Sequence, residues 1–179
     1  MISRITDQLY LGEYSDVIGS TDAETKCHMI QLNILGITDI LSLLCNEGIE
    51  SCLIEKEVEA FKVNQKGKIK LQLHHQPVPT NLKVAGRHDA YQVGFQLAIK
   101  KINNIFYNNP KAVLLIHCVG GVDRSPFLLA AYLARSRHSD IAEAYKIIKK
   151  NRSHVIEHSE WVWWSKSPQS VQIQKDQAS

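Results

Sequence analysis

The sequence predicts an α/β fold of three layers, in which a central, mostly parallel sheet is flanked by helices. Two observations support this prediction. Short apolar runs that suit interior strands, residues 37–44 and 112–118, alternate along the chain with segments of helical periodicity. Strands connected through helices are typical of α/β layer structures, whose neighbouring strands run parallel.

Two further strands are indicated by alternating apolar and polar residues at 5–12 and 68–75, a pattern typical of half-buried strands. The stretch 45–67 carries a weaker pattern, and there we expect a short helix around residues 55–61. A long loop, 74–88, follows the second strand. Long loops in compact domains are often functional, so this loop is a candidate part of the site.

Four segments place apolar residues at helical spacing: 21–36, 89–109, 125–138 and 140–152. In the second of them, Asp89 and Gln92 have the spacing of a capping box. Ser125 followed by Pro126 suits the start of the third. The basic run at 149–152 is typical of a solvated helix end, where cations complement the helix dipole.

The composition indicates one globular domain. The chain has 179 residues, with 21 Lys and Arg against 18 Asp and Glu, giving a net charge of +3. We expect a single domain over residues 1–165, followed by a polar and disordered tail, 166–179. The small charge excess gives no reason to expect a nucleic-acid partner.

The chain shows no apolar run near the ~20 residues that span a bilayer, and no apolar segment of a secretory signal. Its four cysteines match no zinc pattern, and the pair His74-His75 has no third ligand in the sequence. We therefore expect a cytoplasmic monomer with reduced thiols, no membrane insertion, no metal and no cofactor.

The segment 118–125, "CVGGVDRS", joins the apolar run 112–118 to the helical segment that follows. A loop between a strand and a helix collects free N–H groups, which together with the helix dipole favour an anion. Gly120 and Gly121 permit a tight turn close to that anion. Arg124 offers a planar fork that suits two phosphate oxygens.

These surroundings favour the thiolate of Cys118, because nearby positive charge stabilises it. Cys118 is then a nucleophile aimed at the bound phosphoryl group, and Arg124 stabilises the transition state. The hydroxyl of Ser125 can reach the sulfur, while His117 is expected to be structural. The predicted phosphate-binding residues are Val119, Gly120, Gly121, Val122, Asp123, Arg124 and Ser125.

The stretch "HCVGGVDRS", His117 to Ser125, matches H-C-x-x-G-x-x-R-[ST] and so resembles the signature loop of protein tyrosine phosphatases. Three other segments resemble the dual-specificity branch of that family: "ITDQLYLG", "LGITDILSLL" and "EAYKIIKKNRSHV". The resemblance covers residues 5–164. It implies a metal-independent phosphatase of phosphorylated tyrosine, serine and threonine in proteins, with a phosphocysteine intermediate on Cys118.

The sequence departs from the family at the general acid. The resemblance implies an Asp about thirty residues before the nucleophile, but the expected place, Thr80-Asn81, holds none. One candidate is Asp89, 29 residues before Cys118. The other is Asp123, because myotubularin-type lipid phosphatases have a similar arrangement of an Asp before the Arg.

Three functions therefore remain open. The first is a phosphatase of proteins, and the second a phosphatase of other phosphates, such as phosphoinositides or RNA 5′ ends. The third is a phosphate-binding pseudophosphatase with weak turnover. The loop contains no Lys, which weighs against highly phosphorylated lipids.

Overall fold

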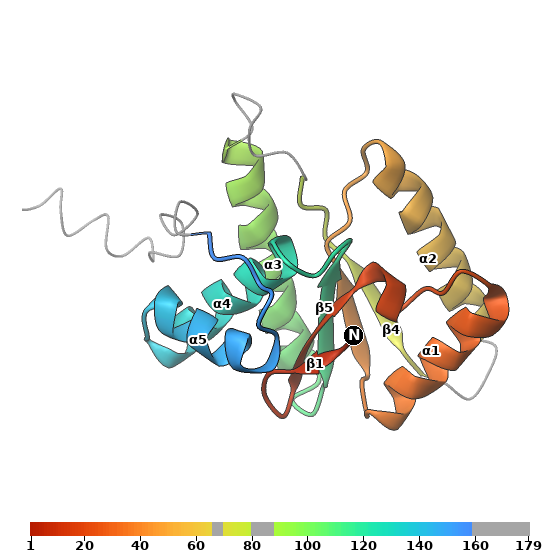
Figure 1. Cartoon of the computed structure of the whole chain (residues 1–179), viewed down its shortest axis with the longest axis horizontal. Coiled ribbons are helices and arrows are strands. Elements are labelled where there is room, and N and C mark those ends of the chain that lie inside the picture. The colour runs from red at the N-terminus through yellow and green to blue at the C-terminus, as the bar shows by residue number, and fades with distance from the viewer. Residues whose placement is uncertain (66–69, 80–87, 159–179) are drawn as a thin grey trace, which may run out of the picture.

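The computed structural model describes residues 1–65, 70–79 and 88–158 (Figure 1). These residues form a sheet of five strands in the order β1-β2-β5-β3-β4. The strands are β1 (Ser3–Arg4), β2 (Leu9–Glu13), β3 (Asp39–Ser42), β4 (Gln72–His75) and β5 (Leu114–Cys118). Only the pairing of β1 with β2 is antiparallel, so the prediction of a mostly parallel sheet is confirmed.

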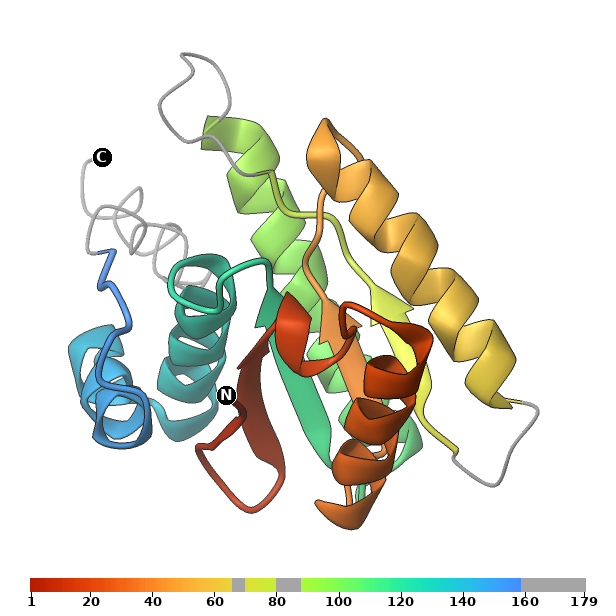
Figure 2. The same cartoon turned by 45° about the vertical axis from the view of Figure 1, so that its right-hand side comes forward.

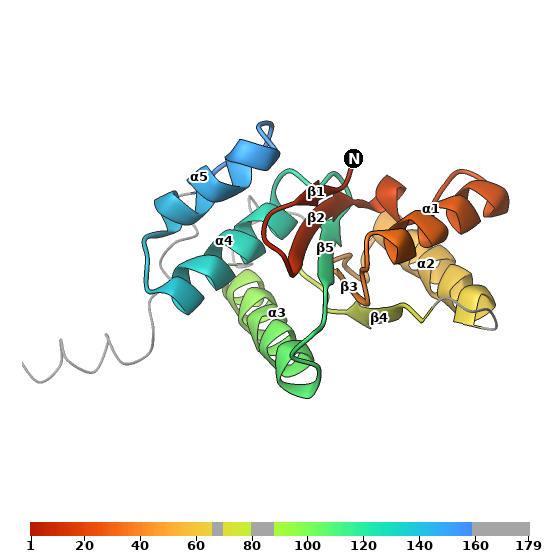
Figure 3. The ribbon, with the colours of Figure 1, turned by 90° about the horizontal axis from the view of Figure 1, so that it is seen from below.

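Helices cover both faces of the sheet, which confirms the three layers. Figure 3 shows α1 and α2 on one side and α3, α4 and α5 on the other. The described elements outside the sheet are η1 (Tyr14–Asp16), α1 (Asp22–Ile34), α2 (Ile49–Gln65), α3 (His88–Asn108), α4 (Arg124–Arg137) and α5 (Ile141–Asn151). Among the described residues, no helix combines the length and apolarity needed to cross a membrane.

The central strand β5 is buried on both faces, as the apolar run predicts. Its side chains alternate between two apolar clusters, because successive residues of a strand point to opposite faces. Leu114 and Ile116 pack with the α3–α5 layer, and Leu115 packs with the α1–α2 layer. In register, Ile116 lies between Leu11 of β2 and Leu41 of β3. These contacts fix where β5 ends.

Two elements differ from the sequence-based expectations. Strand β2 begins at Leu9 and its first four residues are all buried, so the expected half-buried strand at 5–12 is wrong. Its central position between β1 and β5, with helices on both faces, accounts for this burial. Helix α2 runs over 17 residues rather than the short stretch 55–61.

Helix α3 begins at His88, so Asp89 lies in its first turn and not at the predicted cap position. The side chain of Asp89 is outside the described residues. The same holds for Thr80-Asn81 and for the whole of the predicted tail, 166–179.

The junction between β5 and α4 lies at the carboxyl edge of the sheet, beside the loops that follow β2, β3 and β4 (Figure 2). Ligands of open α/β sheets bind at this edge, where loops from several strands converge. The fold therefore places the segment 118–125 at the position where parallel sheets bind ligands.

Candidate active site

The structure brings together the three residues that the sequence singled out at the β5–α4 junction. Cys118 is the last residue of β5, and Arg124 is the first residue of α4. The Cys118 Sγ lies 3.3 Å from the Ser125 Oγ. The side chains of Cys118, Arg124 and Ser125 are all buried, so the group forms the floor of the loop between them. We call residues 118–125 the signature loop.

The carbonyl groups of the signature loop are bonded from outside. The three hydrogen bonds are Tyr14 N–H to the Val119 oxygen at 3.0 Å, Arg152 Nε to the Gly121 oxygen at 3.0 Å, and Ile156 N–H to the Val122 oxygen at 3.1 Å. The donors come from η1, from the residue after α5, and from the segment beyond it. Three separate parts of the chain thus hold the loop.

These bonds determine where the amides of the loop point. All described peptide bonds are trans, and in a trans unit the N–H points away from the carbonyl. The N–H groups of Gly120, Val122 and Asp123 are therefore turned to the inner side of the loop. Within the described part of the chain, no protein acceptor binds the N–H groups of residues 119–123. With the N-terminal end of α4 they form a cradle for an anion.

Gly121 is the residue on which the turn depends. Its φ is +64°, in the left-handed region that favours glycine. A Cβ at this position would lie 2.6 Å from the Gly12 carbonyl oxygen and 2.6 Å from the Arg152 Nη2. At Gly120, by contrast, a Cβ would meet only the Val122 side chain, at 3.7 Å. Only Gly121 is sterically required.

Arg124 is held by a carboxylate that the sequence analysis missed. Its Nη1 and Nη2 donate to the two oxygens of Glu50, at 3.0 and 2.7 Å. Nη1 also lies 3.1 Å from the Leu43 carbonyl oxygen and 2.9 Å from that of Val78. Among the described residues no acceptor contacts the Nε, so the Nε edge of the fork remains available to phosphoryl oxygens.

The Glu50–Arg124 pair keeps both groups charged. Burial acts to lower the pKa of Arg124, but the hydrogen bonds from Glu50 and the neighbouring Cys118 outweigh it and the pKa is raised. Burial acts in the opposite sense on Glu50, yet the bonds from Arg124 and from the Cys45 N–H leave its pKa lowered. The Cys45 N–H donates to Glu50 at 2.7 Å.

A second carboxylate of α2 lies behind the nucleophile. The Nε2 of His117 is 2.8 Å from the Oε1 of Glu57, and both side chains are fully enclosed. The two atoms form a close ion pair without the alignment of a regular hydrogen bond. The Nδ1 of His117 lies 3.3 Å from the Cys118 carbonyl oxygen, which agrees with the predicted structural role of His117.

The missed residues share one signal in the sequence. Glu50 and Glu57 are seven residues apart, on the same face of α2 as Phe61. Acidic residues on the buried face of an amphipathic helix have to be paired, and that pattern could have been recognised. Arg152 is 3% exposed, so the prediction of a solvated helix end is wrong at this position.

The two candidate acids differ in what the structure describes. The Asp123 Oδ1 lies 2.9 Å from the Nε2 of His158, and the Asp123 side chain is 44% exposed. The side chain of Asp89 lies outside the described residues. Its place at the start of α3 is a few residues beyond Val78, whose carbonyl oxygen contacts Arg124.

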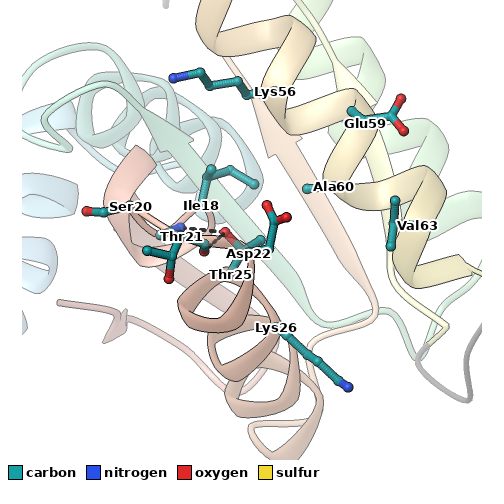
Figure 4. Close-up of a pocket in the computed structure, with 11 residues that line it drawn as sticks. Ile18, Ser20, Thr21, Asp22, Thr25, Lys26, Lys56, Glu59, Ala60 and Val63 are labelled. Carbon is teal, nitrogen blue, oxygen red and sulfur yellow. Dashed lines mark hydrogen bonds between the residues drawn. The ribbon is translucent and has the colours of Figure 1, made fainter.

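The other polar features singled out in the sequence take structural partners. The Nε2 of His74 is 2.7 Å from the Asp39 Oδ1, and that of His75 is 2.7 Å from the Leu44 carbonyl oxygen. Over the described ranges, no group of His, Cys, Asp and Glu is arranged to hold a metal ion. A cavity of about 580 Å³ between α1 and α2 is lined by no residue of the signature loop (Figure 4).

The dual specificity phosphatase catalytic domain model matches residues 9–164. The chain belongs to the dual specificity phosphatase family. The matched range includes every element described above except β1, and the signature loop lies inside it. This membership makes the chain a cysteine-based phosphatase that acts on phosphorylated substrates. No curated protein matches the sequence at a significant level.

Solved structures agree with the fold of this phosphatase. The human tyrosine phosphatase-like serine/threonine/tyrosine-interacting protein aligns with a TM-score of 0.64 and 16% identity, over 96% of this chain and 97% of its own. A kinase associated phosphatase whose catalytic-site cysteine is replaced by serine gives 0.64 and 16%, over 100% and 96%. The Cydia pomonella PTP-2 phosphatase gives 0.63 and 18%, over 92% and 88%.

We predict that Gly121→Ala destabilises this phosphatase and that Gly120→Ala does not. A Cβ at residue 121 meets the Gly12 carbonyl and takes a left-handed conformation that costs about 1–2 kcal/mol before any steric strain. Urea denaturation of both variants measures the difference. Equal stability of the two would show that the loop relaxes around the added methyl group.

We predict that Glu50→Gln lowers the free energy of unfolding by about 3 kcal/mol, because it leaves the Arg124 charge buried without its partner. The lowered pKa of Glu50 means that its contribution is fully present above the pKa of an unfolded Glu. The contribution is lost as the pH falls through the folded value, so wild type and variant should converge in acid.

The matched control is Glu59→Gln, on the same helix, whose side chain is 68% exposed. It should change the stability by no more than about 0.5 kcal/mol. Denaturation curves at neutral and acidic pH compare the three proteins. A gap between wild type and Glu50→Gln that stays constant into acid would contradict the ion pair.

Proposed function

We propose that this phosphatase hydrolyses phosphate monoesters of proteins, phosphotyrosine as well as phosphoserine and phosphothreonine, with Cys118 as the nucleophile. The observation that carries this proposal is the position of the Cys118 Sγ at the base of a loop whose amides are free and whose end is Arg124. A thiol, an oxyanion cradle and a planar cation thus converge on one phosphoryl position.

In the first step the Cys118 thiolate attacks phosphorus, and the bond to the ester oxygen breaks. The amides of residues 119–123 and the Nε edge of Arg124 bind the phosphoryl oxygens throughout, and Glu50 fixes the direction of the guanidinium. The leaving oxygen takes a proton from the general acid. The product of this step is a phosphocysteine.

In the second step water attacks the phosphocysteine, and Cys118 leaves as a thiolate. The Ser125 hydroxyl, 3.3 Å from the sulfur, donates to that thiolate and makes it a better leaving group. The reaction releases inorganic phosphate and restores the enzyme. Every group that this sequence of steps needs is a side chain or amide of this chain.

Asp89 is the general acid in this proposal. It starts α3, directly after the segment that leads from Val78, whose carbonyl oxygen contacts Arg124. The competing Asp123 has one carboxylate oxygen engaged by His158, which favours Asp89 by comparison. The resemblance to the family supports the same choice, since the loop before α3 is where its members keep the acid.

The catalytic domain extends over residues 1–165 in this proposal, and the chain works in the cytoplasm. A reducing compartment keeps the thiols that this chemistry needs from forming disulfides. The four cysteines are free in the structure, and Cys45 and Cys118 are the buried ones. Phosphoinositides and RNA 5′ ends remain the competing substrate class.

We expect Cys118→Ser to abolish hydrolysis of an aryl phosphate and Arg124→Lys to lower it by about two orders of magnitude or more, because Lys lacks the planar fork. Cys27→Ser, an exposed cysteine of α1, is the matched control and should keep full activity. Parallel assays with phosphopeptides, a phosphoinositide and 5′-phosphorylated RNA assign the substrate class. Full activity of Cys118→Ser would remove Cys118 from the mechanism.

The acid is tested by its leaving-group dependence. If Asp89 is the acid, Asp89→Asn should impair hydrolysis of phosphotyrosine and phosphoserine esters about 100-fold and spare nitrophenyl phosphate, whose leaving group needs no proton. Asp123→Asn should show no such selectivity. The reverse pattern would assign the acid to Asp123, and small equal effects of both on every ester would favour a weakly active phosphate-binding protein.

A further inference from the structure

The mechanism above makes no use of the contact between Asp123 and His158. The His158 Nε2 and the Asp123 Oδ1 are 2.9 Å apart, and the two side chains are 16% and 44% exposed, respectively. Asp123 directly precedes Arg124 in the signature loop. The chain therefore carries a carboxylate on the loop that binds phosphate, where its charge opposes a dianionic ligand.

Asp123 holds the cap position of α4 but does not cap it. An Asp there normally accepts an N–H from the first turn of its helix. Here the side chain makes no such bond and lies against His158 instead. The first amides of α4 thus stay available to an anion, and the imidazole holds the carboxylate.

The residues 152–158, which we call the clamp segment, hold three successive residues of the signature loop. The contacts are Arg152 Nε to the Gly121 oxygen at 3.0 Å, Ile156 N–H to the Val122 oxygen at 3.1 Å, and His158 Nε2 to Asp123 Oδ1 at 2.9 Å. The third contact involves an imidazole, a group that can change its charge between about pH 5 and 8.

We propose that His158 is a positioning residue that holds the clamp segment on the signature loop through Asp123, and that its positive charge offsets the Asp123 carboxylate when an oxyanion enters. The proposal rests on the proposed function of the loop. Protonated His158 strengthens oxyanion binding, and neutral His158 weakens it. The other charged groups on the elements packed against the pair are Glu13, Arg124, Lys149, Glu157 and Arg152, and all of them are present in every variant below.

The test measures sulfate binding, because sulfate stays a dianion across the pH range used. Its dissociation constant follows from the protection of Cys118 against iodoacetamide at pH 6 and pH 8. The gain in affinity on going from pH 8 to pH 6 should be about fivefold larger in the wild type than in His158→Gln, which keeps a donor but carries no charge. His154→Gln, an exposed residue of the clamp segment, should behave as the wild type.

Asp123→Asn is the second variant, and it should lose the same pH dependence because the charge that His158 offsets is gone. It should also shift the NMR signals of the His158 ring, which report the pair without any ligand. Equal pH dependence in wild type, His158→Gln and Asp123→Asn would overturn the proposal while leaving the phosphatase function intact. Sulfate that protects Cys118 in no protein would overturn both, and unchanged ring signals would show that the pair does not form.

Discussion

The orientation of the peptide units in residues 119–123 is the constraint on which the site depends. Their N–H groups have to stay free of protein acceptors, although unpaired backbone groups inside a protein cost free energy. The structure meets this constraint by binding the carbonyl side of the loop instead. Donors from η1, from Arg152 and from Ile156 hold the carbonyls outward, and the free amides face the place of the ligand.

The buried charges follow from the same constraint. A cation that is to bind phosphate has to be desolvated and yet remain charged, and an isolated buried charge is unstable. Glu50 solves this problem for Arg124 by occupying one edge of the fork, and Glu57 gives His117 a close partner in the layer below. Helix α2 therefore acts as the support of the site even though it contributes no residue to the signature loop.

Most of the sheet, and the chemistry of residues 118–125, could be predicted from the sequence. Local patterns carried that information: the apolar run before Cys118, the two glycines and the Arg at a helix start. Glu50, Glu57 and Arg152 could not be assigned this way, because their roles depend on partners 60 to 74 residues distant or more than 30 residues upstream. Strand β2 was misjudged for a related reason, since its burial comes from β5, which lies about a hundred residues further along the chain.

The spread of these supports along the chain has a consequence for biosynthesis. The loop is held by Tyr14 from one end of the chain and by Arg152 and Ile156 from the other, while Arg124 is held by Glu50. Contacts of such large sequence separation form late in folding, because closing long loops costs entropy before the contacts repay it. A nascent chain that has emerged only as far as α4 contains the cysteine and the arginine but lacks the segment that shapes the loop between them. The anion cradle is therefore completed only when the last described residues have left the ribosome and docked.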